Sequence, residues 1–174
     1  GLFFDDGFPA GLAVPSLSKM GWGTSFIDYD RDGDRDLFAV NGHMDDAFEV
    51  QDNVSYAQQN QLFRNVAGVF AEITDEAGSG LALQHVSRGS AAADYDNDGD
   101  VDLAVSNNGG PGVLLANDAE AAGNWLSVVL QGAAPDNRDA VGARVELLAG
   151  GRWQVDEVRH GSSYLSSEDP RLHF

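Results

Sequence analysis

Ten aspartates in two copies of one pattern are the residues of this chain whose types and spacing could do chemistry. Each copy reads Asp-Tyr-Asp-x-Asp-Gly-Asp-x-Asp-Leu, and the second begins 66 residues after the first. Carboxylates packed this densely repel one another by about 1 kcal/mol per pair at ~4 Å in water, so the pattern predicts a cation among them. The ten residues are Asp28, Asp30, Asp32, Asp34 and Asp36 in the first loop and Asp94, Asp96, Asp98, Asp100 and Asp102 in the second.

A hard divalent cation bound by oxygen atoms fits such a loop best. Ca²⁺ takes about 6–8 oxygen ligands, and alternate residues of a tight loop turn their side chains inward to supply them. Glycine at the sixth position, Gly33 or Gly99, permits the sharp turn. We expect carboxylate ligands from the first, third, fifth and ninth positions, and a backbone carbonyl from Asp34 or Asp100. The sequence therefore predicts two calcium sites, with a solvated acidic turn as the alternative.

The residues after each loop indicate strands rather than helices. The twelfth position, where an EF-hand needs a bidentate Glu, holds Ala39 in one copy and Val105 in the other. The runs Leu-Phe-Ala-Val and Leu-Ala-Val-Ser that follow are apolar and β-prone, without a helical period. Each loop should therefore join two strands, and because the loops lie in different units we expect them to bind calcium separately.

The repeat extends beyond the loops, because residues 1–5 align with residues 68–72. Four short antiparallel strands per unit are typical of a β-propeller blade. Apart from the strand leading into each loop, the expected strands are Leu2–Phe4, Asp36–Val40, Gln61–Arg64, Val69–Ile73, Asp102–Ser106 and Gly112–Ala116.

From Gly123 the pattern changes to a separate β-rich module without a third loop. Strands are predicted over 124–130, 141–148 and 152–158, with Gly150-Gly151 as a two-residue hairpin turn between the last two. The predicted fold is all-β, with two propeller-type blades at 1–66 and 67–122 and the module at 123–174.

Composition narrows the functional classes. The formal net charge of -18 disfavours nucleic acid and anionic membranes as partners. The chain has no cysteine for disulfides, and no apolar run approaches the ~20 residues needed to span a bilayer. Calcium loops suit a secreted, cell-surface or periplasmic setting. Because Gly1 opens the chain without a signal peptide, we expect a mature or truncated product.

Three stretches carry a resemblance to known families. The two Asp loops with their Gly-rich lead-ins resemble FG-GAP/VCBS repeats, the propeller blades also found in integrin α heads. The string at 137–145, together with 161–166 and 169–174, looks like the ASPIC/UnbV family related to cartilage acidic proteins, as do 41–43 and 61–65. The resemblance implies secretion and no known catalytic activity.

These observations predict a secreted calcium-binding adhesion or recognition module in which calcium is structural. Its partner would be an extracellular protein or glycan. A structural subunit of an extracellular assembly is one alternative, and an enzyme acting on polysaccharide is another. A glycosidase needs two acids in different environments about 5–9 Å apart, whereas these aspartates lie in equivalent loops.

Several other side chains suit structural roles better than a site. The four histidines, His43, His85, His160 and His173, have no spacing that places two on one face with a carboxylate. Arg138, in the turn Asn137-Arg138-Asp139, could bind a carboxylate or lock the turn, and we favour the turn. Trp125 is predicted to be core and Trp153 exposed.

Two blades alone would leave sheet edges open. We therefore expect Phe3 and Phe4 to be buried by sequence outside this chain or by another subunit, and the isolated chain to self-associate.

Overall fold

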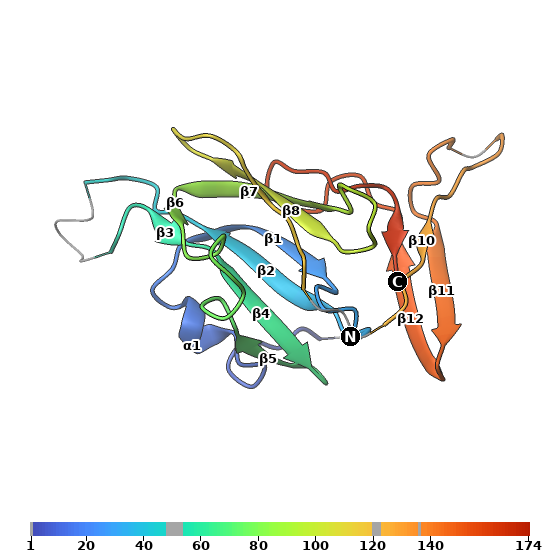
Figure 1. Cartoon of the computed structure of the whole chain (residues 1–174), viewed down its shortest axis with the longest axis horizontal. Helices are drawn as coiled ribbons and strands as arrows, with labels where there is room; N and C mark the ends of the chain where they lie inside the picture. The colour runs from blue at the N-terminus through green and yellow to red at the C-terminus, as the bar shows by residue number, and fades with distance from the viewer. Residues whose placement is uncertain (1, 48–53, 120–122, 136) are drawn as a thin grey trace.

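The computed structural model describes residues 2–47, 54–119, 123–135 and 137–174 and confirms an all-β fold. The first sheet is antiparallel with strand order β1-β2-β4-β5 (Figure 1). Its strands are β1 (Gly21–Ile27), β2 (Asp36–Asn41), β4 (Gln61–Val66) and β5 (Val69–Glu72). One short helix, α1 (Ala13–Ser16), precedes it.

The second sheet repeats the first three strands of this arrangement. Its order is β7-β8-β9, with β7 (Ser87–Ala93), β8 (Asp102–Asn107) and β9 (Val113–Leu115). A small ladder of β3 (Gln58–Gln59) and β6 (Gln84–His85) also joins the two repeats. The two Asp loops connect β1 to β2 and β7 to β8, as the sequence predicts.

The C-terminal segment forms two further two-stranded ladders at one end of the sheets (Figure 1). β11 (Arg144–Ala149) and β12 (Arg152–Glu157) make a hairpin, and β10 (Ser127–Val128) pairs with β13 (Leu172–His173). The predicted hairpin turn is confirmed, since Gly150 and Gly151 both adopt positive φ, at 58° and 81°.

The hydrophobic core lies between the two sheets, where β1 is adjacent to β7. Phe38 and Val40 of β2 are fully buried, and they share one cluster with Leu103 and Val105 of β8. Ser25 of β1 and Ser90 of β7 are both buried, with their hydroxyls 3.1 Å apart. Alternate residues of the strands face this core, which is the period of two that a half-buried strand requires.

Several sequence predictions need correction. Leu2–Phe4 forms no strand, because no other described strand lies beside it to take its backbone hydrogen bonds. The strand expected over 124–130 shortens to β10. β5 pairs with β4 and so belongs to the first sheet, while the division of the chain at residue 66 stays a prediction.

The number of propeller blades stays a prediction. Among the described residues the sheets do not close into a barrel or a ring. Phe3 and Phe4 are exposed, and their burial by further sequence or a second subunit also remains a prediction. Within the described residues, no helix has the length and hydrophobicity of a transmembrane span.

Candidate metal centres

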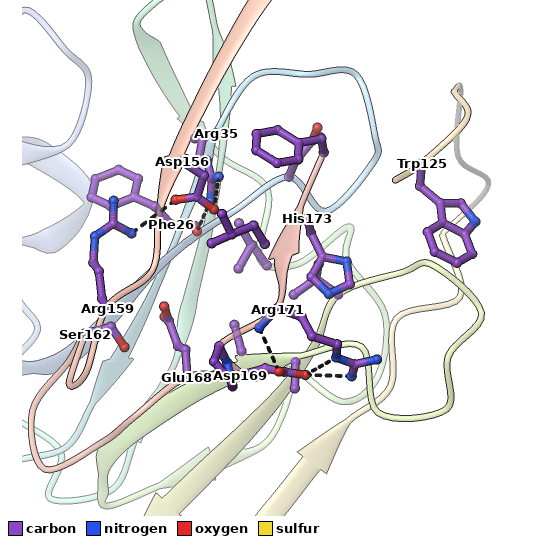
Figure 2. A pocket seen from close by; sticks show the side chains of 18 of the residues that line it. Phe26, Arg35, Trp125, Asp156, Arg159, Ser162, Glu168, Asp169, Arg171 and His173 are labelled. Atoms are coloured by element: carbon purple, nitrogen blue, oxygen red, sulfur yellow. Dashed lines mark hydrogen bonds and ion pairs between the residues drawn. The ribbon is translucent and has the colours of Figure 1, made fainter. Parts of the chain in front are cut away.

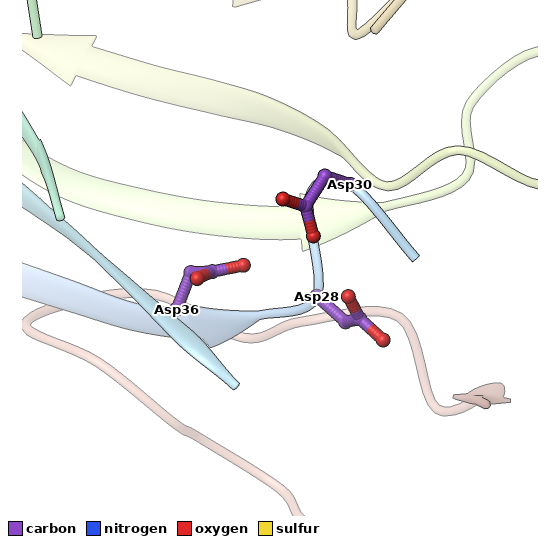
Figure 3. A group of neighbouring side chains, drawn as sticks. All are labelled: Asp28, Asp30 and Asp36. Atoms are coloured by element: carbon purple, nitrogen blue, oxygen red, sulfur yellow. The ribbon is translucent and has the colours of Figure 1, made fainter. Parts of the chain in front are cut away.

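The strand-loop-strand geometry brings three carboxylates together in each Asp loop. Oxygens of Asp28, Asp30 and Asp36 lie within 4.8 Å of one another (Figure 3). Asp28 follows the end of β1, and Asp36 is the first residue of β2, so pairing of the two strands places both at the mouth of the loop. The second loop repeats this cluster, with its members at Asp94, Asp96 and Asp102.

The first-position aspartate organises the turn. Asp28 accepts hydrogen bonds from the backbone N–H of Asp32 at 3.0 Å and of Gly33 at 2.9 Å. The second loop repeats both bonds onto Asp94, at 3.1 and 3.2 Å. Bonds of this kind bend the backbone around the carboxylate, so the later carbonyls and side chains converge on it.

Two left-handed residues in each loop make the turn sharp. Gly33 has φ 86° and Gly99 has φ 95°, a region in which a side chain is disfavoured. The fourth position is also left-handed, with φ 53° at Arg31 and 63° at Asn97. A non-glycine residue in this region costs of order 1 kcal/mol, so the loop tolerates strain to keep its shape.

The ninth-position aspartate is held from both sides. Asp36, 1% exposed, accepts from the backbone N–H of Asn65 at 2.8 Å and of Tyr29 at 3.2 Å. Asp102 accepts the corresponding bonds, with Asn117 in place of Asn65. Sequence reasoning missed both asparagines. The available signal was that each stands just after an expected strand, at the same point of its repeat.

The aspartates at the fifth and seventh positions of each loop lie outside the three-carboxylate clusters. Asp32 accepts a hydrogen bond from Asp34 N at 2.8 Å, and the second loop repeats this contact at 2.9 Å. The side chain of Asp34 pairs with Arg152, and that of Asp100 pairs with Arg31 at 3.0 Å. These pairs suit the prediction that the seventh position offers a metal only its backbone carbonyl.

The electrostatics of the first cluster favour a cation. Burial, and then the neighbouring carboxylates, raise the pKa of Asp36 to about 7, against the opposing hydrogen bonds from Asn65 and Tyr29. Burial likewise raises the pKa of Asp28 to about 6. The fold therefore holds these groups where their negative charge is penalised, and a bound cation would remove the penalty.

The two loops are in contact, and their separate binding of calcium stays a prediction. Arg31 of the first loop forms its ion pair with Asp100 of the second. Asn117, which supports the second loop, donates from Nδ2 to the carbonyl of Tyr29 in the first loop at 2.8 Å. β1 and β7 lie side by side, so the loops that follow them emerge together.

A cavity of about 70 Å³ lies between the loops and the C-terminal segment (Figure 2). Asp156 and the arginines Arg35 and Arg159 pair on one side of it, and Arg171 pairs with Asp169 on the other. Burial lowers the pKa of His173, which also lines the cavity.

The remaining candidates are two tryptophans and the turn at Asn137. Trp153 is exposed, as predicted, but Trp125 is 42% exposed rather than core because it lies before β10, in a segment without strand structure. Asn137 closes its own turn, accepting from Val141 N at 2.7 Å and donating to Val141 O at 3.1 Å. These bonds support the structural reading of that turn, and Arg138 is exposed beside it.

Comparison with protein families agrees with the resemblance seen in the motifs. Residues 28–105 match the family model for the FG-GAP-like repeat, and residues 133–174 match that for ASPIC and UnbV. The first match spans both Asp loops, and the second covers the β11–β12 hairpin and β13. No curated protein matches the chain.

Proposed function

For a chain that combines an FG-GAP-like repeat region with an ASPIC/UnbV segment, we propose the function of a secreted, calcium-stabilised recognition or adhesion module. The observation that carries the proposal is the cluster of three carboxylates, built twice with the same backbone hydrogen bonds. Two copies of one geometry in adjacent repeats indicate a common structural role.

The donor set selects the class of metal. Both clusters consist of carboxylates, which are hard oxygen ligands, and the chain has no cysteine. Soft or borderline metals such as zinc prefer thiolate and imidazole, whereas calcium and magnesium take oxygen. A flexible loop that mixes carboxylates with backbone carbonyls suits the larger and less strict coordination sphere of calcium.

The loop residues would hold the ion from both strands at once. Asp28 extends β1 and Asp36 begins β2, with Asp94 and Asp102 in the same places on β7 and β8. Bound Ca²⁺ would supply positive charge among the carboxylates and tie the two strands of each loop together. Calcium would thereby make the loop ends of the sheets more rigid, and a partner that binds this rigid surface would bind in a calcium-dependent way.

Two other functions compete with this proposal. Exposed Phe3 and Phe4 support self-association in an extracellular assembly. Enzymatic hydrolysis of a glycan is disfavoured because an acid and a base act together at one bond, whereas the two clusters repeat one loop geometry in separate repeats.

Calcium titration calorimetry tests the metal assignment. We expect two ions per wild-type chain and about one for Asp30→Asn or Asp96→Asn, since each change removes a central carboxylate. Glu76→Gln is the matched control, because Glu76 is exposed and lies outside the loops. Wild-type protein that takes up no calcium would refute the proposal. A glycan and protein array probed with calcium and with chelator would then identify the partner class.

A further inference from the structure

Two arginines of the C-terminal segment reach one Asp loop each. Arg152, the first residue of β12, donates from Nη1 to the carbonyl of Asp32 at 2.6 Å and pairs with the Asp34 carboxylate. Arg171, just before β13, donates from Nη2 to the carbonyl of Asp94 at 2.6 Å and from Nη1 to Asn97 Oδ1 at 2.6 Å. Each guanidinium therefore binds two groups of a loop simultaneously.

These contacts use the outer surface of the loops and leave the carboxylate clusters free. Their acceptors are the side chains of Asp34 and Asn97, the carbonyl of Asp32, and the carbonyl rather than the clustered carboxylate of Asp94. Arg171 is oriented by Asp169, which accepts from Nε at 2.6 Å, and Asp169 N bonds to Ala92 O of β7 at 3.1 Å. An arginine placed in this way can respond to the shape of a loop without competing for its metal.

The C-terminal segment depends on such contacts for its order. Within the described residues the β11–β12 hairpin pairs with no third strand, and β10 and β13 are two residues each. An isolated two-stranded hairpin is only marginally stable in water, so docking must supply the remainder. Besides the two arginines, Arg35 of the first loop pairs with Asp156 of β12 at 2.7 Å.

We propose that Arg152 and Arg171 couple metal occupancy of the two loops to docking of the C-terminal segment. Without a cation the clustered carboxylates repel and the loops open more readily, which displaces the carbonyls that the arginines bind. A closed, occupied loop presents those acceptors in fixed positions. Linkage is reciprocal, so the docked segment in turn favours the closed loops. This inference rests on the calcium binding proposed above.

Hydrogen exchange of the β11–β12 amides in the full chain, with calcium and with chelator, measures the coupling. In wild-type protein, calcium at about ten times Kd should slow exchange of these amides about fivefold or more, the lower end of typical coupling between sites. Docking that ignored the loops would leave the rates equal, and that result would overturn the proposal.

The double variant Arg152→Lys, Arg171→Lys isolates the geometry from the charge. Lysine keeps the positive charge but cannot reproduce the planar two-pronged contact. We expect calorimetry still to find two calcium ions per chain, while the calcium-dependent slowing of hairpin exchange is lost. Retention of the full slowing in this variant would overturn the proposal.

Arg144→Lys is the control, because Arg144 lies on the same hairpin but pairs with Glu146 on an exposed face. It should leave the calcium-dependent slowing unchanged, and loss of the slowing here would show that the effect is not specific to the loop contacts. Calorimetry separates the two proposals. Absence of calcium uptake would refute the proposed function, whereas uptake without slowed exchange would refute only the coupling.

Discussion

Replacing Asp36 by Asn should flatten the pH dependence of stability in metal-free protein. Asp36 is buried, and burial together with neighbouring carboxylates raises its pKa to about 7 in the folded chain. A carboxyl whose pKa rises on folding stabilises the fold while it is protonated. That contribution is complete below about pH 4 and is lost as the pH rises through about 7.

The size of the effect follows from the shift. One pKa unit corresponds to about 1.4 kcal/mol, so a shift from 3.8 to about 7 corresponds to ~4 kcal/mol as an upper bound. Asp28 belongs to the same cluster and its pKa is about 6, so the two contributions overlap rather than add. In chelator, wild-type protein should therefore lose of order 2–4 kcal/mol between pH 5 and pH 8.

Urea unfolding at pH 5 and pH 8, in chelator and in calcium, measures this loss. The stabilisation by calcium should be larger at pH 8, because protons compete with the ion at pH 5. Asp36→Asn should show a smaller loss in chelator and a smaller gain from calcium, whereas the exposed-site control Glu76→Gln should behave as wild type. A calcium increment equal at both pH values, or the same pH profile in Asp36→Asn, would refute the reasoning.

Three further outcomes are expected. Because Arg31 bridges the loops, Asp30→Asn should also lower calcium affinity at the second loop, and Arg31→Gln should reduce that effect, as read by calorimetry; an undiminished effect would show that the bridge carries no coupling. Gly99→Ala should lower the thermal unfolding temperature more than Gly68→Ala does. Both glycines have positive φ, but only a Cβ at Gly99 would overlap Trp125. Equal losses of stability in the two variants would contradict that contact. Phe3→Ser should shift the sedimentation of the 174-residue chain toward monomer, and a wild-type chain already monomeric would refute self-association.

The local features of the site could be predicted because they depend on neighbouring residues. The spacing of the aspartates, the glycine at the sixth position and the β-prone runs on either side are contained within one loop and its flanks. The Gly150-Gly151 turn is equally local. The expectation that Asp34 and Asp100 use only their carbonyls also follows from loop position, and the outward ion pairs of both side chains agree with it.

Contacts between residues far apart in the sequence could not be predicted from local patterns. Arg152 and Arg171 contact loops 118 and 77 residues earlier in the chain, and nothing near either arginine in the sequence indicates a partner. Trp125 was expected in the core because its neighbours are apolar, but β10 pairs only with β13 at the periphery. The contact between the two loops could not be predicted because the sequence places them in different units, whereas β1 and β7 are neighbours in the fold.

The aspartate at the seventh position of each loop pairs with an arginine from outside that loop. Together these two ion pairs link the second loop to the first, and the first loop to the C-terminal segment. Arg31, at the fourth position of the first loop, pairs with Asp100 of the second, and Arg152 takes the same place at Asp34 of the first loop. Arg171 binds Asn97, which occupies in the second loop the position of Arg31. The C-terminal segment therefore supplies the arginine for Asp34 of the first loop and the arginine for Asn97 of the second loop. If the loops bind calcium as proposed, binding at either loop would therefore act on the same docked segment.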